Sequence, residues 1–273
     1  MSTAAGGREP GRDLARAIRA TVVEQSWRAG VGHIGSALCV ADLLAALYGE
    51  VLVDHDPADP DRDRVVVSKG HAALAVYAAL HARGWLDDDE LDTFCGDGTL
   101  LGVHPDAGLP GVDFTTGSLG QGLSYAAGSV LAARLQRSAR RAFALVSDAE
   151  CDEGALWEAA MFAAHHRLGR LVALVDVNGQ QALGATADVV SLEPLADRWA
   201  SFGWEVHEVD GHDVAALART AGAPADERDR PRVVLARTTF GKGVSFMEGR
   251  LGWHYWPLDA GQYEQARAEV AAG

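Results

Sequence analysis

V-S-D-A-E-C-D-E-G-A-L-W-E-A at residues 146–159 and L-V-D-V-N-G-Q at residues 174–180 are the two stretches that decide the fold. A strand is predicted over the apolar residues 142–146, and the carboxylate of Asp148 comes just after it. A second strand is predicted over residues 171–176, and the amide of Asn178 follows it, thirty positions after Asp148.

The segment between these strands is predicted to be a helix over residues 155–168. It carries four apolar side chains at helical spacing: Trp157, Met161, Ala164 and Leu168. In a strand–helix–strand unit both following loops emerge at the same carboxyl edge of a parallel sheet, where ligands bind. Asp148 and Asn178 would then bring two oxygen ligands side by side. Because such ligands suit a hard cation such as Mg²⁺, which commonly grips phosphate, the two stretches predict a metal–diphosphate site.

The length, apolar content and net charge of the chain limit the classes of protein to which it can belong. The chain has 273 residues, 48% of them hydrophobic, which suffices for one large α/β domain. Its net charge of −14 argues against nucleic acid or an anionic membrane surface as a partner. Diphosphates and sugar phosphates are also anions, so a site for them requires local positive charge, from a metal ion or from histidines.

Residues 1–12 are polar and glycine-rich, and we expect them to be disordered. They do not resemble a signal peptide, and no stretch of the chain is long and apolar enough to cross a membrane. Residues 13–273 are predicted to form one domain. The three cysteines are odd in number and lack metal-ligand spacing, which favours a reduced, cytoplasmic location.

The other elements alternate between helices and strands. Helices are predicted over residues 14–28, 40–51, 72–83, 86–97, 122–135, 192–202 and 214–220, and strands over 64–68, 205–209 and 232–237. Residues 224–231 are predicted to be a surface loop. This alternation predicts an α/β fold, with a doubly wound, mostly parallel sheet and helices on both faces.

The two stretches resemble a known family. An Asp followed after about thirty residues by an Asn resembles the thiamine-diphosphate motif, and E-G-A-L-W-E-A-A-M-F-A-A at residues 153–164 resembles transketolases. The resemblance implies the thiamine-diphosphate-binding fold. It also implies that Asp148, Asn178 and the backbone carbonyl of Gln180 hold Mg²⁺, with Ca²⁺ or Mn²⁺ as alternatives. Two motif glycines are replaced, by Ser147 and Ala149, and the added methyl of Ala149 could weaken cofactor binding.

Four histidines lie in segments that match the same family. His33 lies in G-H-I-G-S, His71 in S-K-G-H-A, His104 in V-H-P-D and His254 in W-H-Y. Taken alone, a histidine beside glycines is more often structural. The resemblance implies that His71 lies near the diphosphate, that His33 and His104 face the sugar, and that His254 lies between cofactor and sugar. Imidazole titrates near neutrality, so such histidines suit proton transfer beside a carbonyl.

A glycine-rich loop, T-T-G-S-L-G-Q-G at residues 115–122, strongly resembles the transketolase loop that contacts the aminopyrimidine ring. Lys242, in a loop before the last histidine, is either an anion ligand or a solvated side chain. The resemblance assigns these residues to the cofactor: His71, Gly117, Ser118, Leu119, Asp148, Ala149, Glu150, Asn178 and His254. It assigns the catalytic roles to His33, His104 and His254.

The match spans about residues 14–265 but resembles only the N-terminal half of a full-length transketolase. We therefore expect a subunit of a split transketolase, inactive without a partner that carries the second half, in an α2β2 assembly. Trp253, Tyr255 and Trp256 are either interface or core residues. The substrates would be a ketose and an aldose, with or without phosphate. Two alternatives stay open: a subunit of another thiamine-diphosphate enzyme, such as a 2-oxoacid dehydrogenase or a specialised carboligase, and a non-catalytic scaffold subunit.

Overall fold

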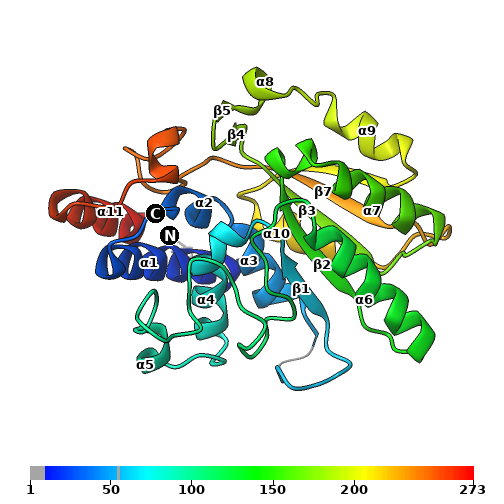
Figure 1. Ribbon diagram of the computed structural model, residues 1–273, viewed down its shortest axis with the longest axis horizontal. Coiled ribbons are helices and arrows are strands. Elements are labelled where there is room, and N and C mark those ends of the chain that lie inside the picture. Colours follow the sequence, from blue (N-terminus) through cyan, green and yellow to red (C-terminus); the bar gives the residue numbers. More distant parts are fainter. Residues whose placement is uncertain (1–9, 54–55) are drawn as a thin grey trace, which may run out of the picture.

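The computed structural model describes residues 10–53 and 56–273, which are built around a five-stranded parallel sheet (Figure 1). The strands lie in the order β1 (Arg64–Val67), β2 (Ala142–Ser147), β3 (Leu171–Val177), β7 (Arg232–Arg237) and β6 (Glu205–Asp210). Strands β2 and β3 are buried along their whole length, as expected for parallel strands covered on both faces.

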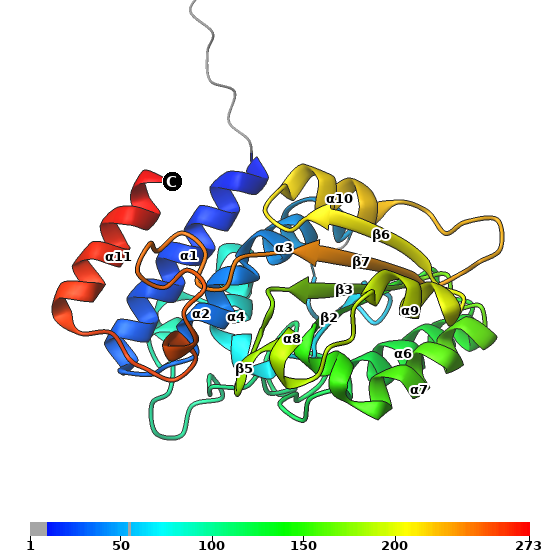
Figure 2. The same cartoon turned by 90° about the horizontal axis from the view of Figure 1, so that it is seen from above.

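Helices cover both faces of the sheet, as Figure 2 shows from above. One face is covered by α1 (Pro10–Ala29), α2 (Ile34–Cys39), α3 (Ala41–Ala46), the π-helical turn η1 (Leu47–Val51), α4 (Ala73–Ala82), α10 (Val214–Gly222) and α11 (Ala260–Ala272). The other is covered by α6 (Gly122–Gln136), α7 (Gly154–His165) and α9 (Leu195–Ser201). Short elements complete the fold: η2 (Gly70–Ala72), α5 (Asp88–Leu91), η3 (Ala149–Asp152), β4 (Gln180–Gln181), β5 (Gly184–Ala185), α8 (Thr186–Val189) and η4 (Leu251–His254).

Alternating side chains of each strand pack into two separate hydrophobic cores, one on each face of the sheet. Phe143 and Leu145 of β2 join the core under α1 to α4, whereas Ala144 and Val146 join the core under α6 and α7. A strand presents successive residues to opposite faces, so an unbroken apolar run fills both cores. The predicted doubly wound fold is confirmed.

Several predicted boundaries differ from the structure. Helix α1 begins at Pro10, so residues 10–12, which we expected to be disordered, are helical; residues 1–9 lie outside the described part of the chain. Helices α2 and α11 were not predicted, and α5 spans four residues rather than the expected 86–97. In α7 the predicted apolar face was wrong, because Leu156, Ala159, Ala160 and Ala163 are buried while Met161 is 49% exposed. Among the described helices, none is both long and apolar enough to span a bilayer.

The sheet topology places the site. Strands β1, β2, β3 and β7 are mutually parallel, so their carboxyl ends lie at one edge. The loops after these strands begin at Ser68, Asp148, Asn178 and Thr238. Ligands of open parallel sheets bind outside this edge.

Candidate active site at the carboxyl edge of the sheet

A cavity of ≈ 550 Å³ opens at this edge and holds all four predicted histidines. His33 precedes α2, His71 lies in η2 after β1, and His254 ends η4. His104 lies in the long connection between α5 and α6. Nine of the predicted site residues line this one cavity: His33, His71, His104, Gly117, Leu119, Ala149, Asn178, Gln180 and His254.

Three of the imidazole rings form a tight triangle. The ring centroids are 5.6 Å apart for His33 and His71, 5.3 Å for His33 and His254, and 5.1 Å for His71 and His254. Phe240, from the loop after β7, stacks on His254 with 6.0 Å between centroids. These side chains come from segments far apart in the sequence, so the cluster depends on the tertiary fold.

The His104 ring packs against two glycines, Gly70 and Gly117. A Cβ atom on Gly70 would lie 3.0 Å from Cδ2 of His104 and 2.8 Å from the backbone nitrogen of Gly117. A Cβ on Gly117, whose φ is +138°, would lie 3.1 Å from the same ring carbon. A side chain at Gly70 or Gly117 would therefore push apart the loop after β1, the glycine-rich loop and the His104 ring. This close packing explains why both positions are glycine.

Three of the clustered histidines are neutral near pH 7. Burial, reinforced by Lys69 and the neighbouring histidines, lowers the pKa of His71 to about 2. Burial and His33 lower the pKa of His254 to about 4. Burial, then His104, also lowers the pKa of His33. A neutral imidazole has one donor and one acceptor nitrogen, so each of these rings can exchange a proton with a bound hydroxyl group.

His33 has an unused hydrogen-bonding atom. Its backbone is left-handed, with φ at +63°, which is uncommon for a residue other than glycine. Its Nδ1 atom is shut off from solvent and has no hydrogen-bond partner among the described residues. Because a buried polar atom without a partner costs free energy, this nitrogen suits a polar group of a bound ligand.

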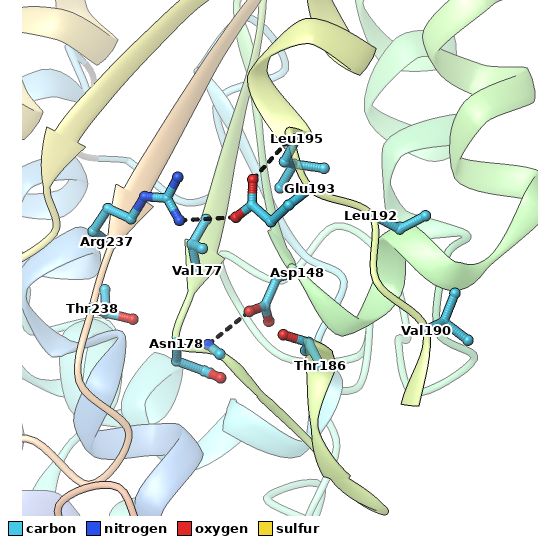
Figure 3. Close-up of a pocket in the computed structure, with 11 residues that line it drawn as sticks. Asp148, Val177, Asn178, Thr186, Val190, Leu192, Glu193, Leu195, Arg237 and Thr238 are labelled. Carbon is cyan, nitrogen blue, oxygen red and sulfur yellow. Dashed lines mark hydrogen bonds and ion pairs between the residues drawn. The ribbon is translucent and has the colours of Figure 1, made fainter. Parts of the chain in front are cut away.

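Asp148 lies next to the loop that carries Asn178. Its carboxylate accepts hydrogen bonds from the backbone N–H groups of Ala149, at 2.9 Å, and Gly179, at 2.8 Å. Asp148 and Asn178 also line one smaller pocket of ≈ 270 Å³ (Figure 3). The β2–α7–β3 unit thus brings the predicted carboxylate and amide to adjacent positions.

The Asn178 amide is held in a defined orientation. Its Nδ2 donates to Asp176 at 2.9 Å, which leaves Oδ1 on the other side, where it accepts the backbone N–H of Gln180 at 2.9 Å. Within the described residues no three His, Cys, Asp or Glu side chains converge on a metal position. A metal ion here would therefore need the amide and carbonyl oxygens expected from the sequence, together with Asp148; oxygen donors of this kind fit Mg²⁺.

Asp148 is costly to ionise in the absence of a cation. Burial, with the nearby negative charge of Asp176, raises its pKa to about 7. A bound cation would lower this pKa instead, because it stabilises the ionised carboxylate. The raised pKa fits a carboxylate whose partner is a ligand rather than another side chain of the chain.

A buried network beneath the cavity was not predicted from the sequence. Asp176, fully buried in β3, accepts hydrogen bonds from Lys69, Asn178, Thr238 and the thiol of Cys39. Burial alone would lower the pKa of Lys69, but Asp176 raises it, so the ammonium stays charged. An acidic residue inside an otherwise apolar strand, and a lysine at a strand end, were the signals available in the sequence.

Two other predicted cofactor contacts line neither of these cavities. Glu150 is fully buried, and its carboxylate accepts hydrogen bonds from Ser68 Oγ and from the backbone N–H groups of Gly120 and Ser147, both at 2.9 Å. It therefore holds the glycine-rich loop in place. Ser118 is exposed and lies outside the lining, between Gly117 and Leu119, which do line the larger cavity.

Comparison with known proteins shows which family this chain resembles over nearly its whole described length. Residues 11–272 match the family model described as the thiamine diphosphate binding domain of transketolase. The chain is 41% identical over 259 residues to the 6-deoxy-6-sulfo-D-fructose transketolase subunit of a Clostridium strain, covering 94% of both chains. It is 38% identical over 255 residues to an apulose-4-phosphate transketolase subunit of Phocaeicola vulgatus, covering 93% of this chain and 91% of that one.

Solved structures show the same fold over part of their length. Transketolase from Leishmania mexicana superposes with a TM-score of 0.87 and 29% identity, and the match covers 97% of this chain but 42% of that one. Transketolase from Campylobacter jejuni gives a TM-score of 0.85 and 28% identity, over 96% of this chain and 42% of that one.

Proposed function

The chain belongs to the transketolase family, as its thiamine-diphosphate-binding part, and we propose that it is the cofactor- and Mg²⁺-binding subunit of a two-component transketolase. In this proposal it transfers a two-carbon ketol unit from a ketose to an aldose, together with a partner subunit. The observation that carries the proposal is the single cavity in which four histidines meet Asn178, Gln180 and Ala149.

The proposed metal site uses Asp148, Asn178 and the carbonyl of Gln180. Mg²⁺ there would neutralise the diphosphate, which an acidic protein of net charge −14 otherwise repels. Asp176 orients the Asn178 amide so that its oxygen, and not its nitrogen, faces away from the buried network. When bound, thiamine diphosphate supplies the carbanion chemistry of ketol transfer; the protein binds and orients it.

The histidines are proposed to act on the sugar. His33, His104 and His254 line the cavity in which substrate hydroxyl and carbonyl oxygens would lie, and an imidazole can exchange protons with such oxygens. His71, whose pKa burial lowers to about 2, is proposed to contact the cofactor instead. Gly117 and Leu119 line the cavity where the glycine-rich loop would face the cofactor ring, with Ala149 near the diphosphate.

The partner is proposed to supply the second half of the active site. Related proteins are named as subunits, and this chain spans 42% of the full-length transketolase structures. Apolar side chains are exposed near the cavity, with Tyr255 at 54%, Trp256 at 61% and Leu119 at 39%. Trp253, by contrast, is buried in the core, so it is not a candidate interface residue. We propose an α2β2 assembly, since an obligate interface tends to be large and apolar.

The substrate is proposed to be a sugar, phosphorylated or otherwise anionic. Two relatives are named for a sulfonated fructose and for apulose 4-phosphate. Three proton-exchanging side chains, His33, His104 and His254, suit a polyhydroxylated molecule better than a simple 2-oxoacid. The location is proposed to be cytoplasmic, because all three cysteines are free thiols.

The reconstituted pair tests this proposal. The chain would be co-purified with the proposed partner, a companion of about 300 residues, the size expected of a second domain pair. Ketol transfer from xylulose 5-phosphate to an aldose, with no turnover of pyruvate, is expected. Turnover of pyruvate without ketol transfer would instead assign the chain to another class of thiamine enzyme.

A further inference from the structure

A second cavity, of ≈ 350 Å³, lies on a different part of the molecule and shares no lining residue with the histidine cavity. It lies between α1 and α11, which run side by side in both views of the fold (Figures 1 and 2). Basic side chains dominate its lining: Arg12, Arg16 and Arg19 of α1, and Lys242 of the loop after β7. Such a concentration of cations is unexpected in a chain of net charge −14.

The two acidic side chains in the lining, Asp42 and Glu269, already accept hydrogen bonds. Asp42 accepts hydrogen bonds from Arg19 and, at 2.6 Å, from Nδ1 of His212. Glu269 accepts from the backbone N–H and the hydroxyl of Ser245, at 2.5 and 2.8 Å. Both oxygens of each carboxylate therefore already accept hydrogen bonds.

Two of the cations are only loosely held. Arg16 pairs with Asp13 at 2.8 Å, but both side chains are nearly half exposed. Lys242 lies 3.8 Å from Glu248, at the limit of an ion pair. Exposed pairs of this kind contribute little, so either side chain can turn to a ligand at small cost.

The floor of the cavity contains a donor without a partner. Nε of Arg19 is shut off from solvent and makes no hydrogen bond within the described residues. Gly243, with φ at +92°, lies against this side chain: a Cβ there would be 3.3 Å from Cδ and 3.6 Å from Nε of Arg19. The glycine thus keeps space open beside an unpaired N–H, which suits an acceptor oxygen.

From this arrangement we propose that the cavity is a binding site for a small soluble phosphate-type dianion, separate from the cofactor site. Guanidinium groups bind phosphate oxygens through paired hydrogen bonds, and an ammonium adds a mobile point charge. The proposal is independent of the proposed enzymatic function.

Lysine reactivity provides a readout confined to this cavity. The chain has two lysines, Lys69 and Lys242, and the side chain of Lys69 is 1% exposed. Acetylation of the peptide carrying Lys242, followed by mass spectrometry on the full chain without thiamine diphosphate, would be measured against inorganic phosphate. We expect saturable protection by phosphate that potassium chloride at the same ionic strength does not reproduce.

Two matched arginine variants test whether phosphate binds in this cavity. Arg16→Gln is expected to weaken the phosphate affinity at least about tenfold, the effect of one lost charge-assisted hydrogen bond. Arg137→Gln removes the same charge from another basic surface pocket, beside Arg134 and Arg170, and is expected to leave the affinity unchanged. Absence of saturation, equal protection by chloride, or equal weakening by both substitutions would overturn the proposal. Protection by phosphatidic acid vesicles but not by phosphate would overturn the assignment to a soluble anion.

Discussion

The Lys69 ammonium and the Asp176 carboxylate form an ion pair 2.5 Å apart, with the two side chains 1% and 0% exposed. The pair lies directly beneath the cavity, because Lys69 lines it and Asp176 binds the Asn178 amide. It joins the loop after β1 to the end of β3.

Removal of the Lys69 charge should destabilise the fold strongly. Lys69→Met leaves Asp176 as an uncompensated buried charge, and we expect a loss of about 3–5 kcal/mol in the free energy of unfolding. Lys242→Met, at the only other lysine and on the surface, should change it by less than about 1 kcal/mol. Urea unfolding of both variants provides the measurement. Equal stabilities would show that the pair is not what holds these loops.

Neutralising Asp148 should abolish metal-dependent cofactor binding. Asp148→Asn keeps the shape of the side chain but removes the negative charge that Mg²⁺ requires, so thiamine diphosphate affinity should fall by at least about 100-fold. Calorimetry on the assembled pair, with and without Mg²⁺, measures this. Asp188→Asn, at an exposed aspartate of α8, is the control and should bind normally. Unchanged thiamine diphosphate affinity in Asp148→Asn would show that this carboxylate is not a metal ligand.

Acid should destabilise the chain through His71. Its pKa is lowered to about 2 in the folded chain from an unfolded value of 6.5, so between these values the unfolded chain binds a proton that the folded chain does not. Stability conferred by the neutral ring is therefore lost as the pH falls below about 6.5, by about 1.4 kcal/mol per pH unit for one proton. Urea unfolding of the parent chain and His71→Asn between pH 7 and pH 5 tests the slope, which should be shallower in the variant. Identical slopes would contradict the buried, neutral imidazole.

Restoring a motif glycine should strengthen cofactor binding. Ala149 lines the cavity, and at the proposed diphosphate position its methyl group would occupy space that a glycine leaves free. Ala149→Gly is therefore expected to tighten thiamine diphosphate binding about two- to tenfold in the assembled pair, as relief of a crowded contact. Weaker binding in the variant would mean that the methyl packs favourably against the cofactor.

Much of the fold followed from local pattern. The strands at residues 142–147 and 171–177 begin with apolar runs, residues 142–146 and 171–175, and each run is followed by a polar residue, Ser147 or Asp176; such runs predict buried parallel strands. Because loops that follow parallel strands share the carboxyl edge of the sheet, Asp148 could be predicted to lie beside the Asn178 loop from the sequence alone. Helix α11 was missed because its sequence shows little apolar periodicity, and only Ala266 and Val270 are buried.

The rest of the site depends on tertiary contacts that no local pattern reports. Lys69 and Asp176 are 107 residues apart, and neither sequence neighbourhood indicates that they pair. The buried position of Glu150 was not predicted, because the direction of a side chain within the turn η3 depends on its partners Ser68 and Gly120. The four histidine segments were predicted to form one pocket, but the close contact of the His33, His71 and His254 rings is visible only in the fold.

The position of the bound metal ion decides whether Asp148 and Asn178 anchor the cofactor. Crystals of the assembled pair grown with thiamine diphosphate and Mn²⁺, in place of Mg²⁺, would locate the ion by anomalous scattering. We predict a peak about 2.2 Å from oxygens of both Asp148 and Asn178, with the Gln180 carbonyl as a third ligand. A bound cofactor whose metal lies away from these residues would contradict the proposed site.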